Sequence, residues 1–364
     1  TLWTATAHII TVVIGAGVLS LAWSVAQLGW IAGPAVMIVF ALITYYSSSL
    51  LADCYRFPDP VSGPNKNYTY RDAVRANLGD RQAWLCGLVQ YLGLCGTCIA
   101  YTITASISMR AIRESDCYHK NGHDYQCQFS EYTFTIIFGM AQVILSQVPN
   151  FHKVSGLSII AAIMSISYST IGLVLGIARV VENGKFYGSI GGISLSTSQK
   201  LWRVLQAVGD IAFSYPFSVL VIEIENTLKS PPENKTMKKS SMFAVVTTTF
   251  FYVLCGCFGY AAFGDNAPGN IFTGFGFYEP YWLVDFANAC IVVHLVGAYQ
   301  VLGLLGGAKF WPLVVYFPVR MHIVQNKFKH WTIDWVLLQT FSFLCLLISV
   351  GSTLGSIEGL VKGR

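Results

Sequence analysis

Residues 2–27 read LWTATAHIITVVIGAGVLSLAWSVAQ. A helix crosses the hydrocarbon core of a bilayer with about 20 apolar residues. The run continues past Ile14 to Trp23 and beyond, which is too long for the core of a cleavable signal peptide. We therefore expect a membrane-spanning segment here. Because the chain begins at Thr1 and enters this run almost at once, we also expect it to be a fragment that lacks a native cytosolic tail.

Further apolar runs of similar character follow along the chain. Hydrophobic residues make up 54% of the sequence and charged residues 11%, against roughly 25% charged in an average soluble protein. So few charges cannot cover two or three soluble cores, so the lipid bilayer is the expected solvent. We predict one transmembrane domain over residues 1–364 with ten candidate spans: residues 2–27, 31–54, 84–112, 132–148, 154–181, 205–228, 241–263, 281–301, 302–323 and 331–357.

The loops differ in their content of basic residues. Loops after the second and sixth runs hold most of the Lys and Arg, and the net charge is +5. Cytosolic loops are enriched in Lys and Arg, so we expect a cytosolic N-terminus. The loop with Cys117 and Cys127 then faces outward, where a disulfide can form. The basic residues form no stripe, so nucleic acid is not an expected partner.

The junction at residues 301/302 breaks this alternation. The run 281–301 heads inward, and the next run follows without a polar loop and meets the basic residues Arg320, Lys327 and Lys329. If this basic cluster is cytosolic, both runs travel inward. We therefore expect a span and its loops to be missing between Val301 and Leu302. The alternative is a tight hairpin, which would place the basic cluster outside.

The first span carries a candidate break at Ile14-Gly15-Ala16-Gly17-Val18. Two glycines allow non-helical backbone and a close approach of a ligand. A helix that restarts at Val18 points the positive end of its dipole at an anion such as a carboxylate. The alternative is a contact of small residues between packed helices.

The sixth span carries a second candidate break. Pro216 has no N–H and disrupts the preceding turn, which frees carbonyls near Ala212 and Phe213 to accept an ammonium group. Ser214 and Tyr215 add hydroxyls. A simple proline kink is the alternative. Transporters often bind substrate at broken helices in corresponding spans of two repeats, so we interpret the two breaks as a pair.

Ionisable side chains inside membrane spans are costly and commonly functional. A satisfied helix–helix hydrogen bond is the alternative for each. Glu223 and Glu225, near the cytosolic end of the sixth span, are instead expected to pair with the basic loop. The predicted proton-coupling residues are His8, Asp210, Asp285 and His294.

Several chemistries find no support in the sequence. It has no phosphate-binding Gly-Lys-Ser loop, no His-Glu-x-x-His or paired Cys/His ligand set, and no regular Arg repeat within a span. We therefore expect no ATP drive, no metal or other cofactor, no voltage sensor and no enzymatic activity. Polar residues cluster at the breaks rather than along a continuous pore, which disfavours a passive channel.

Motifs along nearly the whole chain resemble those of plant amino acid permeases. On these residues the chain is identified as a member of the amino acid/auxin permease family. The matching segments are residues 2–23 with His8, 27–34, 67–74, 209–213, 230–234, 259–265, His294 with 297–300, and 306–312.

The resemblance implies a proton-coupled symporter of the plant plasma membrane that imports neutral and acidic amino acids by alternating access. The implied all-α fold is the inverted five-plus-five repeat of the bacterial leucine transporter, with repeats at residues 1–181 and 204–323 and a last helix at 331–357. By position, Ile14, Gly15, Ala16, Gly17 and Val18 would hold the substrate carboxylate. Phe213, Ser214 and Tyr215 would hold the amino group and part of the side chain.

The chain departs from the family pattern in two places. Family members have eleven spans, and here we expect the ninth to be missing together with the end of the eighth. Arg320 stands where the family usually has an acidic residue. A non-transporting, receptor-like or truncated isoform is therefore the alternative function.

Overall fold

The computed structural model describes residues 1–122, 124–147, 155–215, 217–228, 232–276, 280–302 and 310–361. These residues form helices and one antiparallel pair of two-residue strands, β1 (Arg56–Phe57) and β2 (Asn65–Lys66), so the predicted all-α class is confirmed. The helices are α1 (Leu2–Val13), η1 (Ala16–Ser20), α2 (Leu21–Ala52), α3 (Tyr70–Leu78), α4 (Asp80–Asn121), α5 (Glu131–Ser146), α6 (Ser155–Asn183), α7 (Thr197–Ser214), η3 (Ser218–Leu220), α8 (Val221–Glu225), α9 (Glu233–Phe263), η4 (Gly264–Asn266), η5 (Ile271–Gly274), α10 (Tyr281–Leu302), η7 (Phe310–Tyr316), α11 (Phe317–Gln325) and α12 (Ile333–Val361).

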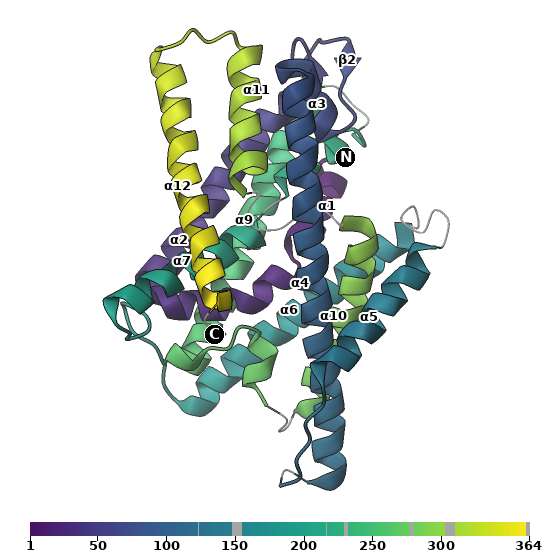
Figure 1. The fold of residues 1–364 in the computed structure, drawn as a ribbon, viewed down its shortest axis with the longest axis vertical. Coiled ribbons are helices and arrows are strands. Elements are labelled where there is room, and N and C mark those ends of the chain that lie inside the picture. The colour runs from purple at the N-terminus through teal and green to yellow at the C-terminus, as the bar shows by residue number, and fades with distance from the viewer. Residues whose placement is uncertain are drawn as a thin grey trace.

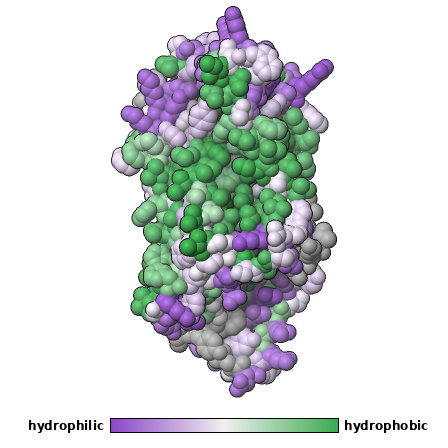
Figure 2. Space-filling view, turned by 90° about the vertical axis from the view of Figure 1, so that its left-hand side faces the viewer, coloured by the Kyte–Doolittle hydropathy of each residue, from purple (hydrophilic) through white to green (hydrophobic). Residues whose placement is uncertain are grey.

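The molecule has the surface of a membrane protein. Figure 2 shows apolar side chains gathered in a band between two hydrophilic ends. Large apolar side chains of this surface are strongly exposed, as for Leu337 (62%) and Leu344 (54%) of α12, which only a lipid environment satisfies. Six described stretches are long and apolar enough to cross a bilayer: Ala16–Ala52, Asp80–Asn121, Ile159–Asn183, Glu233–Asn266, Tyr281–Tyr299 and Ile333–Gly355.

Each of the ten predicted runs overlaps helical backbone in the described residues. The first and sixth runs are each divided between two half-helices, and α1 and α5 are apolar but shorter than a full span. The chain is therefore a multi-pass membrane protein, and the number of ten spans stays a prediction.

Small residues bring the central helices close together. α2 packs against α9 and α7, and α1 packs against α9. A Cβ placed on Gly259 of α9 would lie 2.5 Å from the Cβ of Ala22 in α2. Close backbone approach through small residues is the usual way in which helices associate in a membrane.

A bend at Gly29 separates the first two spans within α2. Gly29 has a φ of +86°, a left-handed value that glycine adopts without steric cost. The segment before α7 supplies partners at the bend, because Ile193 donates to the carbonyl of Ala26 (2.9 Å) and Trp30 donates to that of Ser189 (3.3 Å). The bend falls in the gap between the first two predicted runs.

The two ends of the bundle carry different features. In Figure 1 the strand β2, the helix α3, the connection from α11 to α12 and the start of α1 all lie toward the top. Arg56 and Lys66, in β1 and β2, mark this as the basic end. The C-terminal end of α4 lies at the opposite end, where Cys117 and Cys127 form a disulfide. We call these the basic end and the disulfide end.

α10 and α11 run toward the same end of the bundle. α10 starts at the disulfide end, where Asp285 accepts a hydrogen bond from Ser115 of α4 (2.9 Å). α11 finishes at the basic end, where the side chain of Gln325 donates to the backbone carbonyl of Asp53 (2.9 Å). Two successive membrane segments thus point in the same direction, and residues 303–309 between them lie outside the described residues.

Replacing Gly259 by Ala tests the close packing of α2 on α9. The added methyl group would overlap Ala22, so we expect Gly259→Ala to lower the free energy of unfolding by about 1–3 kcal/mol, measured as a lower unfolding midpoint in detergent. Gly176→Ala is the matched control, because its methyl group would sit at an ordinary 3.6 Å from Phe258. Equal midpoints for the two variants would contradict the packing argument.

Candidate substrate-binding site

The first predicted break is confirmed as an interruption of the helix. α1 ends at Val13, Ile14 has φ −74° and ψ +83°, and Gly15 is extended. Helical backbone resumes in η1 at Ala16. The N–H groups of Ala16 and Gly17 make no backbone hydrogen bond to another described residue, as expected for the first residues of a helix. These two amides are available to a ligand.

The second predicted break is confirmed in the same sense. α7 ends at Ser214, and Tyr215 has φ −107° and ψ +3°. The N–H of Phe217 turns back to the carbonyl of Tyr215 (2.9 Å) instead of continuing the helix. The carbonyls of Ala212 and Phe213 have no backbone partner among the described residues. Pro216, on which the prediction rested, lies outside the described residues.

The two breaks touch each other. A Cβ placed on Gly17 would lie 2.5 Å from Oγ and 3.0 Å from Cα of Ser214. Glycine therefore lets η1 lie directly against the end of α7. This contact brings the free amides of one break close to the free carbonyls of the other.

A cavity of about 980 Å³ lies over this contact. Ala16, Gly17, Ala212 and Phe213 line its inner part. Arg110 of α4 and Glu131 of α5, which flank the disulfide loop in sequence, also line it and lie 3.7 Å apart. The cavity therefore extends from the breaks toward the disulfide end, and it is large enough for a small organic ligand.

Asp210 is the acidic residue of α7 in this cavity. Its carboxylate forms no ion pair or side-chain hydrogen bond with the part of the chain that the structure describes. Its backbone carbonyl accepts from Oγ of Ser214 (3.0 Å), so the carboxylate stands one turn from the break. It can therefore interact with a cation or a proton carried into the cavity.

A second cavity of about 240 Å³ lies on the other side of the first break and is lined by both His8 and His294. His294 is 3% exposed, and its Nδ1 lies 2.8 Å from the carbonyl oxygen of Ala161. Because a carbonyl only accepts, Nδ1 carries a proton. Nε2 lies 3.8 Å from the position of a Cβ on Gly15. The structure therefore brings the two histidines together but separates them from Asp210.

Asp285 lines neither of these two cavities. Its carboxylate accepts from Ser115 at the disulfide end. The four predicted proton-coupling residues thus occupy three separate places. Among the described residues, no three His, Cys, Asp or Glu side chains gather in a way that could hold a metal ion.

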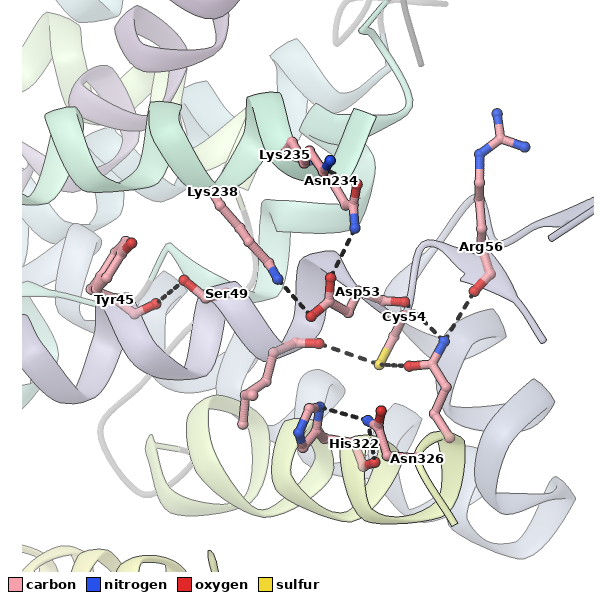
Figure 3. Close-up of polar contacts among 12 residues, drawn as sticks. Tyr45, Ser49, Asp53, Cys54, Arg56, Asn234, Lys235, Lys238, His322 and Asn326 are labelled. Atoms are coloured by element: carbon pink, nitrogen blue, oxygen red, sulfur yellow. Dashed lines mark hydrogen bonds and ion pairs between the residues drawn. The ribbon is translucent and has the colours of Figure 1, made fainter. Parts of the chain in front are cut away.

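A polar network closes the basic end, opposite the large cavity. Asp53, just after α2, accepts from Asn234 (2.9 Å) and Lys238 (2.6 Å) of α9, as Figure 3 shows. Arg56 donates two hydrogen bonds to Glu233 of α9, at 3.1 and 2.8 Å. Glu233 is only 3% exposed, and partly buried, bidentate pairs hold more strongly than surface pairs. We call these five residues the α2–α9 latch.

Within the described part of the basic loop, which excludes Lys229, the expected salt bridges of Glu223 and Glu225 are not formed. Neither residue forms an ion pair with another described residue. Glu223 accepts a hydrogen bond from the N–H of Tyr70 (3.3 Å). Glu225 is buried, and its two carboxylate oxygens have no hydrogen-bond partner among the described residues. Asp53 and Glu233 take the basic partners instead: Asp53 pairs with Lys238, and Glu233 pairs with Arg56 and Lys66.

Sequence reasoning missed Tyr252 of α9. Its hydroxyl lies within hydrogen-bond reach of the carbonyl of Val13 and, at 3.2 Å, of that of Ser214. No motif marks it, because it ends the aromatic run Phe250-Phe251-Tyr252 in an apolar span.

Comparison with known proteins finds a family model, plant relatives and a solved structure that match this chain. A family model described as "Transmembrane amino acid transporter protein" matches residues 1–302 and 300–362. Amino acid permease 3 of Arabidopsis thaliana is 49% identical over 430 aligned positions, which cover 99% of this chain and 90% of that protein. Amino acid permease 2 of the same plant is 50% identical over 433 positions, covering 99% and 88%. A manganese transporter structure from Eremococcus coleocola matches at 12% identity with a TM-score of 0.45, covering 97% of this chain and 72% of that one.

A helical membrane protein with a cavity at two broken helices has the architecture of a transporter. The chain belongs to the transmembrane amino acid transporter family. The sequence-based prediction of an amino acid permease, rather than an enzyme, is thus confirmed.

Replacing Gly17 by Ala tests the contact between the breaks. The new methyl group would overlap Ser214 and push the free amides away from the free carbonyls. We expect amino acid binding by the purified chain to weaken by at least about tenfold, a loss of about 1.4 kcal/mol, in a radioligand assay. Gly139→Ala is the control, because no atom lies within 4 Å of a Cβ there. Unchanged binding in Gly17→Ala would remove the breaks from the site.

The latch can be tested through a native thiol. Cys54 is fully buried beside Asp53, and its Sγ lies 3.6 Å from Oε1 of Gln325. We expect Asp53→Asn to weaken the pair with Lys238 by about 1 kcal/mol and to speed maleimide labelling of Cys54 several-fold, read by peptide mass spectrometry. Asp116→Asn, which breaks the exposed pair with Lys120, should leave this rate unchanged. Equal labelling in both variants would speak against a latch.

Proposed function

We propose that this chain belongs to a proton-coupled symport system that imports neutral and acidic amino acids across the plasma membrane by alternating access. One observation carries the proposal: Ala16 and Gly17, whose amides are free, line the same cavity as Ala212 and Phe213, whose carbonyls are free. An amino acid is a zwitterion whose carboxylate needs donors and whose ammonium group needs acceptors.

The helix dipoles support this orientation of the substrate. η1 and the following α2 present a helix N-terminus, which favours an anion, and α7 presents a C-terminus, which favours a cation. We therefore propose that Ile14 to Val18 hold the carboxylate. Phe213, Ser214 and Tyr215 hold the ammonium group and part of the side chain.

The two ends of the bundle support alternating access. The large cavity extends toward the disulfide end, and the α2–α9 latch closes the basic end. We assign the basic end and the N-terminus to the cytosol, since cytosolic loops are rich in Lys and Arg. Import then requires the α2–α9 latch to open while the large cavity closes at the disulfide end.

The separation of the ionisable groups suggests an order for the proton. Asp210 lines the large cavity, where we place the substrate, whereas His8 and His294 line the small cavity. We propose that Asp210 receives the proton from outside and that the histidines serve its release. Asp285 remains a further candidate, although its partner Ser115 places it near the disulfide end.

The family match supports the proposal of a missing ninth span. The family model matches the chain in two pieces that meet at residues 300–302. The alignments to relatives extend over 430 and 433 positions, whereas the chain has 364 residues, so the relatives carry residues that face gaps here. We propose inverted repeats at residues 1–181 and 204–323, the second incomplete near 301/302.

An incomplete second repeat favours a second candidate function. A truncated or receptor-like isoform would bind amino acids at the intact breaks without moving them. The parallel course of α10 and α11 supports this alternative, because a complete bundle returns the chain between two such segments.

One experiment separates these two functions. The chain is compared in proteoliposomes with a chimera in which the corresponding segment of amino acid permease 3 is inserted between Val301 and Leu302. We expect both proteins to bind amino acids and the chimera to show inward, acid-stimulated current upon substrate addition. In the chimera, Asp210→Asn should keep binding and lose the dependence on external pH.

The outcomes have distinct meanings. Current from the chain itself would exclude the receptor-like alternative. Uncoupled, pH-independent flux in the chimera would refute proton coupling, and absence of amino acid binding in both proteins would refute the proposed site.

A further inference from the structure

The hydroxyl of Tyr252 lies between the ends of the two broken half-helices. Val13 is the last residue of α1 and Ser214 is the last residue of α7. The backbone carbonyls of both residues lie within hydrogen-bond reach of the Tyr252 hydroxyl. Tyr252 itself is completely buried in α9. One side chain from a third helix therefore contacts the terminal carbonyl of each half-helix.

The electrostatics of helix ends make this contact consequential. A helix C-terminus carries a partial negative charge, because its last carbonyls have no partner within the helix. Here two such ends converge in the interior of a membrane protein, where water is scarce. The hydroxyl brings one proton, which it donates to one carbonyl or shares between both. The carbonyl of Val13 also accepts from the N–H of Gly15 (2.8 Å), whereas among the described residues the Tyr252 hydroxyl is the one donor to the carbonyl of Ser214.

Packing holds Tyr252 in this place. α9 packs against α1 and against α2, so the backbone of Tyr252 is fixed relative to the first break. The ring of Tyr215, which follows the end of α7, meets the ring of Tyr252 edge-on at 5.4 Å. Aromatic pairs favour this arrangement. The tyrosine thus contacts the second break through its ring as well as its hydroxyl.

We propose that Tyr252 is a positioning residue that ties the C-terminal ends of α1 and α7 together. The tether fixes the distance between the free amides of Ala16 and Gly17 and the free carbonyls of Ala212 and Phe213. Neither Val13 nor Ser214 lines the large cavity, so Tyr252 acts beneath the substrate rather than on it. The expected effect of Tyr252 on amino acid binding rests on the proposed function. The tether between the ends of α1 and α7 does not depend on that function.

The experiment compares Tyr252→Phe with Tyr70→Phe in the purified full chain. Tyr70 is a matched control, because it is also fully buried and its hydroxyl donates to one backbone carbonyl, that of Leu313, at 2.6 Å. Hydrogen exchange followed by mass spectrometry reports on residues 14–18 and 211–215. We expect exchange there to rise about tenfold in Tyr252→Phe and to stay at the wild-type rate in Tyr70→Phe.

Substrate binding provides the second readout. We expect Tyr252→Phe to weaken amino acid binding about tenfold and Tyr70→Phe to leave it unchanged, although both variants lower the unfolding midpoint. Tyr252→p-aminophenylalanine restores a donor at the same position. It should return both exchange and binding toward wild type, which a purely structural role of the ring would not require.

Each outcome decides the proposal. Wild-type exchange at both breaks in Tyr252→Phe overturns the tether, as does an equal rise in Tyr70→Phe. Faster exchange with unchanged amino acid affinity overturns the positioning role. If the wild-type chain binds no amino acid but exchange at the breaks still rises in Tyr252→Phe, the tether is upheld and the proposed function is overturned.

Discussion

Backbone groups without partners, held where water is scarce, are the constraint on which this structure depends. α1 and α7 end inside the bundle at Val13 and Ser214, and each end leaves carbonyls that the helix cannot satisfy. The chain meets this constraint by bringing the two ends together. Gly17 leaves room for Ser214, and Tyr252 supplies a proton between the last carbonyls.

The groups that remain unsatisfied define the site. The residues with free amides at the start of η1 and those with free carbonyls near the end of α7 line one cavity. In the proposed binding mode, a zwitterion would satisfy both sets at once, so the same constraint that fixes the helix ends would also select the ligand. The polar backbone is tolerated at this depth because it lines a cavity.

The remaining polar groups are arranged on either side of this convergence. Asp210 lies in the large cavity, and His8 with His294 lies in the small one. Beyond the small cavity, Asp53 and Glu233 join α2 to α9 at the basic end.

The sequence by itself determined the membrane class, the positions of the helical segments and both interruptions, because apolar runs and the residues Gly15, Gly17 and Pro216 act locally. The contrast between basic and disulfide ends was equally readable from Lys, Arg and Cys positions. Only the tertiary structure decided which ionisable groups share a cavity. It also decided that the hydroxyl of Tyr252 contacts the C-terminal ends of both α1 and α7. Phe250 is 68% exposed while Tyr252 is fully buried, yet both lie in one apolar run. When a helix is apolar all round, its pattern does not fix which face turns inward, so packing against its neighbours makes that choice.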